Sequence, residues 1–138
     1  MPFTPFHLGP ALLVSLPLFS YVDLPSIIVS SVIVDLEPLS VIVLRLPGPL
    51  HGFFHTYLAG TLLAMLAAIL VYLLRGLLNG TLMPLNLQQK SPFVRIIYSS
   101  LAGVYSHVLL DSFLYEEMTP LYPLSVNPVL GVVSAGLV

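Results

Sequence analysis

The chain has no cysteine, and only 7% of its 138 residues are charged. The lack of cysteine excludes a disulfide framework and any thiolate metal site. The lack of charge excludes an ordinary soluble surface, because soluble domains carry about 25% charged residues. A net charge of −2, with no basic stripe, also argues against a nucleic-acid partner.

Apolar residues take the place of the missing charge, at 57% of the chain and a mean hydropathy of +1.02. A chain this short cannot bury so much apolar surface within itself, because small domains keep a large fraction of their surface exposed. A lipid bilayer can surround the apolar surface that the chain cannot bury within itself. We therefore predict an all-α integral membrane protein, a single domain over residues 1–138, with about four transmembrane helices and short interfacial segments.

Four apolar runs are the predicted helices of this bundle, at residues 6–22, 24–36, 50–78 and 93–115. Thr4 is the expected cap of the first run, which lacks the preceding positive charge of a signal peptide and is expected to stay in the mature protein. Residues 75–92 and 116–127 are expected to be loops. The apolar stretch 39–46 is expected to lie at the interface or dip back into the membrane. The stretch 129–138 is expected to pack on the bundle or continue in a longer chain.

Prolines mark two of the expected helix boundaries. Pro38 disfavours helical geometry at Glu37, so the second helix should end near Asp35 or Leu36. Pro49 suits the first position of the third helix, where its missing N–H costs nothing. Small residues at helical spacing on the last two runs favour close packing of their backbones; they are Gly60, Ala64 and Ala68, and Ser99, Gly103 and Ser106.

Seven ionisable residues stand inside or at the ends of these runs, where such groups are costly and mark function; they are His7, Asp35, Glu37, His51, His55, His107 and Asp111. The pairs His51/His55 and His107/Asp111 are each four residues apart. On a helix this spacing puts both side chains on one face, where two ligands can chelate one metal ion. If the helices alternate in direction, all seven residues meet at the same face of the membrane.

The types of candidate ligand limit which metal ions could bind. Imidazole and carboxylate without thiolate suit zinc, and also manganese or iron, better than calcium or magnesium. Seven candidates exceed the three protein ligands of a catalytic zinc site, so either two or more ions bind or some residues support the others. Asp35 and Glu37 are the predicted catalytic carboxylates, with Glu37 a ligand or the base that deprotonates the attacking water. A two-metal site suits displacement at phosphorus or carbonyl carbon.

Other polar and aromatic residues have simpler expected roles. Arg45 is expected to reach lipid headgroups or to bind a substrate phosphate beside the metal, since a guanidinium matches phosphate oxygens. Asp23 is a predicted helix cap at the opposite face. Glu116 and Glu117 are predicted to be solvated loop charges. Aromatic residues near helix ends are expected to form an interfacial belt; they are Phe53, Tyr57, Tyr115 and Tyr122.

Several of these motifs resemble those of the LexA-regulated, membrane-bound metal-dependent hydrolases (YdjM-like proteins). The matching pieces are residues 4–7 (Thr-Pro-Phe-His), the helix end with Asp35, residues 51–56 (His-Gly-Phe-Phe-His-Thr) and residues 106–111 (Ser-His-Val-Leu-Leu-Asp). In that family the patterns look like Pro-Asp-x-Asp, His-Arg-Gly-x-Thr-His and His-x-x-x-Asp. The family is in turn thought similar to zinc-dependent phospholipase C proteins. The resemblance implies an all-helical fold and a phosphodiester or lipid phosphate substrate.

The functional prediction is a membrane-embedded, metal-dependent hydrolase that acts on a phosphoester or lipid-linked phosphate through a metal-activated water. The alternative is a membrane protein that binds metal for transport, metal loading or structure without catalysis. Arg75, Lys90 and Arg95 are expected on the side of the membrane opposite the seven residues. The side with the seven residues has only one such positive side chain, that of Arg45. The positive-inside rule then predicts that the site faces away from the cytoplasm. The oligomeric state stays open.

Overall fold

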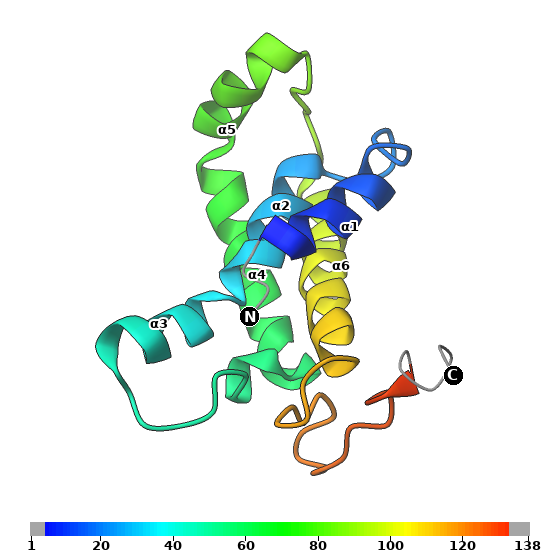
Figure 1. Cartoon of the computed structure of the whole chain (residues 1–138). Coiled ribbons are helices and arrows are strands. Elements are labelled where there is room, and N and C mark those ends of the chain that lie inside the picture. Colours follow the sequence, from blue (N-terminus) through cyan, green and yellow to red (C-terminus); the bar gives the residue numbers. More distant parts are fainter. Residues whose placement is uncertain (1–4, 133–138) are drawn as a thin grey trace.

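The computed structural model describes residues 5–132, and all regular structure in that range is helical, which confirms the predicted fold class (Figure 1). The elements, in chain order, are α1 (Pro5–Ser15), α2 (Leu24–Ile33), α3 (Leu36–Leu44), the 3₁₀ helix η1 (Phe53–His55), α4 (Tyr57–Leu73), α5 (Arg75–Leu82), the 3₁₀ helix η2 (Met83–Leu85) and α6 (Phe93–Ser112). The predicted cap Thr4 and most of the stretch 129–138 lie outside the described residues.

Helix α6 is at the centre of the molecule and packs against both α2 and α4, while α1 packs on α2 (Figure 1). The predicted small-residue stripes make these contacts close. A Cβ atom on Gly103 would lie 2.8 Å from the carbonyl oxygen of Ile27, and one on Gly60 would lie 2.8 Å from Cγ1 of Val104. Any larger residue at these glycines would force the helices apart.

Among the described residues, two helical stretches are long and apolar enough to cross a membrane, Leu24–Leu44 and Phe93–Ser112. The pair Tyr57–Leu73 and Arg75–Leu85 makes a third if it is one bent span. The protein therefore has two or three candidate spans rather than about four. The first predicted helix accounts for the difference, because α1 has 11 residues and reaches only about 16 Å, half of the hydrocarbon thickness.

The prediction of one straight helix over residues 50–78 is wrong at both ends. Pro49 does not begin a helix; a bend and η1 come first, and α4 starts only after Thr56, whose side chain caps it by accepting from Ala59 N–H at 3.1 Å. The helix then bends by 75° near Leu74 into α5, which occupies part of the expected loop 75–92.

Helix α2 ends at Ile33, as predicted within two residues, but the chain turns and resumes as α3 at Leu36. The expectation that Pro38 keeps Glu37 out of a helix is wrong. Both lie in the first turn of α3, where proline is tolerated because that N–H would have no helical partner. In Figure 1, α3 projects away from the other helices, with Asp35 at its inner end.

The end of the bundle where α2 begins is held by buried polar contacts. Asp23 caps α2 by accepting from Ser26 N–H, which confirms its predicted role, and it also pairs with Arg75 at 2.8 Å. The Gln89 side chain accepts from the backbone N–H of Leu24 and donates to two carbonyl oxygens of the preceding turn. These contacts fix the bent helix α5 and its loop against the start of α2.

Candidate metal centre

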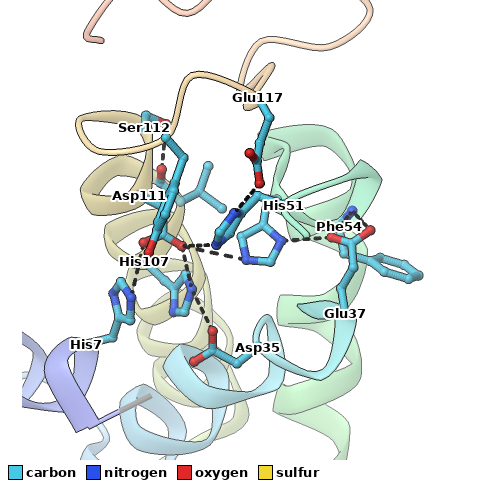
Figure 2. Close-up of polar contacts among 12 residues, drawn as sticks. His7, Asp35, Glu37, His51, Phe54, His107, Asp111, Ser112 and Glu117 are labelled. Carbon is cyan, nitrogen blue, oxygen red and sulfur yellow. Dashed lines mark hydrogen bonds and ion pairs between the residues drawn. The ribbon is translucent and has the colours of Figure 1, made fainter. Parts of the chain in front are cut away.

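The four histidines of the chain converge on one carboxylate, that of Asp111 (Figure 2). Each presents its Nε2 atom to an Asp111 oxygen, at 3.1 Å for His7, 3.2 Å for His107, 3.7 Å for His55 and 3.9 Å for His51. All five side chains are buried, none more than 6% exposed. The predicted meeting of these residues at one end of the helices is what the structure shows.

The two motifs that were predicted to chelate reach the centre in different ways. His107 and Asp111 lie one turn apart on the last turns of α6, as their spacing predicts. His51 and His55 do not lie on a common α-helix, because His51 is in a bend and His55 ends the 3₁₀ helix η1, so the prediction of an α-helical pair is wrong for them. The bend at His51 and the 3₁₀ turn η1 bring the two rings together instead, with centroids 4.8 Å apart.

Three of the four imidazoles are held in place through their other ring nitrogen. The Nδ1 atoms contact the Ser31 carbonyl oxygen at 2.6 Å in His107, Glu37 Oε2 at 2.8 Å in His55 and Glu117 Oε1 at 2.9 Å in His51. An acceptor at Nδ1 fixes the proton there and leaves a lone pair on Nε2, the arrangement found in metal-ligating histidines.

No hydrogen bond of ordinary geometry satisfies Nε2 of His55, Nε2 of His107 or the oxygens of Asp111, although His7 and His107 lie within ion-pair distance of the carboxylate. Where an imidazole is neutral, its Nε2 lone pair faces the carboxylate and is repelled by it, and each unsatisfied buried group costs roughly 1–3 kcal/mol. A cation removes both penalties. Ligands about 2.0 Å from a tetrahedral zinc lie about 3.3 Å from each other, close to the shorter Nε2–Oδ separations here.

Three sets of side chains have ligand atoms that all lie within 4.8 Å of one another, and each could hold a metal ion; they are His7/His107/Asp111, His51/His55/Asp111 and Asp35/His55/His107. The carboxylate of Asp35 lies at the start of α3, with Oδ1 3.6 Å from His107 Nε2. Because the sets share residues, the centre offers overlapping positions for ions. The donor types are those predicted, imidazole and carboxylate, which suit zinc, manganese or iron.

Glu37 lies beside the centre and belongs to none of these three sets. Its carboxylate accepts from the backbone N–H groups of Gly52 and Phe54 and holds the ring of His55. A Cβ on residue 52 would lie 2.8 Å from Glu37 Oε1, so glycine lets the loop close over the carboxylate. These contacts make Glu37 a positioning group for His55. Its predicted roles as ligand or general base stay predictions.

Two residues near the centre were not found by sequence reasoning. Glu117, predicted to be a solvated loop charge, contacts His51, although its side chain is 43% exposed. Tyr115, predicted to join an aromatic belt, stacks its ring on that of His51 at 3.8 Å. Both lie in the loop after α6, and no local pattern marks such residues, because their partners come from a distant part of the chain.

Arg45 is the C-terminal cap of α3, with an exposed side chain and a left-handed φ of 51°. Helix α3 itself projects away from the other helices (Figure 1). The role of Arg45 as a phosphate ligand stays a prediction.

His55 of η1 and His7 of α1 have pKa values shifted in opposite directions. Burial lowers the pKa of His55, and the nearby His107 and His51 lower it further, against a partial opposing effect of Glu37. Burial also lowers the pKa of His7, but its contact with Asp111 and the charges of Asp111 and Asp35 outweigh burial, so this pKa is raised. His55 is thus kept neutral, the form that binds metal.

Comparison with protein-family models, with curated proteins and with solved structures gave no match for this chain. The case for a function therefore rests on the buried cluster of histidine and aspartate in an all-helical protein with candidate membrane spans.

Proposed function

We propose that this protein is a metal-dependent hydrolase that acts at the membrane interface on a phosphoester or lipid-linked phosphate. The convergence of four Nε2 atoms on the buried carboxylate of Asp111 carries the proposal. The position of the cluster supports the substrate class. Asp111 lies one residue before the end of the candidate span Phe93–Ser112, and a helix that spans a bilayer over these residues would hold it at the depth where lipid headgroups begin. The motif resemblance to membrane-bound metal-dependent hydrolases agrees with this proposal.

The residues divide into three roles. Those that would hold divalent ions, zinc first, are His7, His51, His55, His107 and Asp111. A bound ion would supply an activated water and stabilise negative charge on a phosphoryl group. Asp35, 3.6 Å from His107 and 13% exposed, would hold an ion as a further ligand or act as the general base of the site. Glu37 and Glu117 orient the imidazoles from outside.

The proposal is tested with the double variant His51→Ala/His55→Ala. We expect metal content to fall and phosphate release to drop more than about 100-fold, because removing ligands costs more than the 10–100-fold of supporting residues. Purified protein in detergent is assayed for metals by elemental analysis and for phosphate release from phosphatidic acid, polyprenyl phosphates and diphosphates. Full activity of the double variant on every lipid phosphate that the parent cleaves would sink the proposal.

A matched pair of adjacent glutamates provides the control. Glu117→Gln weakens the acceptor at His51 Nδ1 and should lower metal affinity about tenfold. Glu116→Gln makes the same change of charge at an exposed neighbouring position and should leave affinity unchanged. Equal effects of the two changes would show that bulk charge, rather than the contact with His51, sets metal affinity.

A structural metal site is the second candidate, and the burial of the ligands favours it. His55, His107 and Asp111 are at most 1% exposed, which resembles a closed site more than one with an open position. In that case chelation lowers the melting temperature and no phosphate is released. Transport has less support, since the sequence of α4 contains no ionisable side chain other than tyrosine that could continue a polar path.

We also propose that the centre faces away from the cytoplasm, as the distribution of Arg and Lys indicates. The absence of native cysteine makes this measurable with single introduced thiols. On intact cells, an impermeant maleimide should label Ser125→Cys, on the side of the centre, but label Gln88→Cys only after lysis; both positions are exposed. The reverse pattern would place the centre in the cytoplasm.

A further inference from the structure

An apolar groove runs along the surface between α2 and α4 and reaches the metal centre. Its first part, of about 240 Å³, lies between Leu36 and Leu66 and includes Glu37 in its wall. Its second part, of about 360 Å³, continues toward Leu70. The two parts share Ile33 and Leu36 as wall residues, so they adjoin along the same face between the two helices.

The end of the groove at the centre is polar, and the rest is not. Glu37 is the one charged residue in its wall, and Phe54 beside it donates its backbone N–H to the Glu37 carboxylate. The same carboxylate holds His55 at 2.8 Å. The groove therefore ends one hydrogen bond away from an imidazole of the proposed metal centre, whereas its remaining length is lined by Ile, Leu and Val, with Ser40 close to the polar end.

The dimensions fit one leaflet of a bilayer. From Leu63 to Leu70 the groove follows the regular helix α4 for about 10 Å, at 1.5 Å per residue. Half of a bilayer hydrocarbon core is about 15 Å thick. Through Glu37 and His55, the polar end of the groove lies next to Asp111, near the end of the candidate span Phe93–Ser112, so this end is toward the headgroups and the apolar length opens toward lipid.

We propose that this groove binds a single hydrocarbon chain of a membrane lipid, with the lipid's phosphate at the metal centre. The position of the phosphate rests on the proposed function, but the binding of the chain does not. A lipid chain is the occupant that matches an apolar groove facing the bilayer and ending at a polar centre. A second groove, of about 330 Å³ between α1 and α6, has in its described wall neither Glu37 nor any other residue that forms a hydrogen bond with a histidine of the centre, and it serves as the comparison.

The test is photochemical labelling in phosphatidylcholine vesicles that contain a trace of phosphatidic acid with a diazirine in one acyl chain. Peptide mass spectrometry then locates the label. We expect it to concentrate on the groove walls around Leu36 and Leu66. Leu66→Trp fills the groove and should lower this labelling roughly tenfold. Leu62→Trp, on the same helix but outside both described parts of the groove, should leave it unchanged.

A second variant keeps the test decisive if Leu66→Trp does not fold. Leu70→Trp blocks only the far part of the groove, so it should reduce labelling by a diazirine at the chain terminus and spare labelling by one near the headgroup. Uniform labelling of all lipid-facing helices, equal labelling of both tryptophan variants of Leu62 and Leu66, or label confined to the α1–α6 groove would each overturn the proposal.

The same labelling experiment tests the binding of a lipid chain separately from hydrolase activity. Labelling requires no turnover, so concentrated labelling without phosphate release on any lipid would leave the chain site standing and remove the hydrolase. Phosphate release with uniform labelling would do the opposite. Chelation of the metal should weaken labelling by phosphatidic acid but not by the matching diazirine diacylglycerol, which carries no phosphate, if the phosphate is what the centre binds.

Discussion

Replacing Asp111 with alanine is expected to remove bound metal from the protein, with a loss of affinity of more than about 100-fold. Asp111 belongs to two of the three potential ligand sets and is the residue on which all four imidazoles converge. Without it the remaining ligands are mostly neutral rings with no charge to balance a divalent ion. Competition with a chromogenic chelator and elemental analysis of the purified variant measure the effect.

Asp111→Asn distinguishes a metal centre from a cluster held by ion pairs. In the absence of metal, the asparagine amide can donate a hydrogen bond to an imidazole Nε2 that has no partner, such as that of His107. We therefore expect the metal-free variant to melt at the same or a higher temperature than the metal-free parent, while it binds metal poorly. A large loss of stability without metal would instead show that charged histidines paired with Asp111 hold the fold.

Arg75→Met is expected to destabilise the protein by about 2–3 kcal/mol, by an effect unrelated to the metal centre. Arg75 contacts the fully buried carboxylate of Asp23 at 2.8 Å, and removing one member of such a pair leaves a buried charge. The N–H and hydroxyl groups of Ser26 still donate to Asp23, which limits the loss. Thermal unfolding in detergent, followed by circular dichroism, measures the change.

The stability that this ion pair contributes should depend on pH. Burial alone would raise the pKa of Asp23, but its contacts with Arg75, Ser26 and Ser91 outweigh burial and hold it below the ordinary value of 3.8. Its contribution to stability in the parent is therefore present above pH 3.8 and is lost as the pH falls below that value. Arg75→Met should lose this acid sensitivity, because protonation then neutralises an unpaired charge.

The double variant Asp23→Asn/Arg75→Met should recover part of the lost stability. If it is no more stable than Arg75→Met, the buried charge is not the cause of the loss.

Some features of the metal centre could be predicted from local sequence, and others could not. The spacing of His107 and Asp111 predicted their common helix face, and it holds because α6 is regular through both residues. The same spacing in His51 and His55 predicted a helix that is not there. Composition does not separate the two cases, since a 3₁₀ turn and an α-helix can carry the same apolar residues. The side chain of Thr56 caps α4, so the α-helix begins at Tyr57 and both histidines precede it.

Scarcity of charge and the placement of the few ionisable groups can be read along the chain, so they predicted the helical class, helices apolar enough to span a membrane, and the histidines and aspartates that meet at the centre. Three-dimensional packing was needed to show which ring nitrogen each histidine presents, that Glu37 and Glu117 hold imidazoles in place, and that the helix after Leu74 bends toward Asp23. Each of these features depends on a hydrogen-bond or ion-pair partner, and most of those partners are distant in sequence. The periodicity of a helix relates only residues a few positions apart, so local patterns cannot identify such partners.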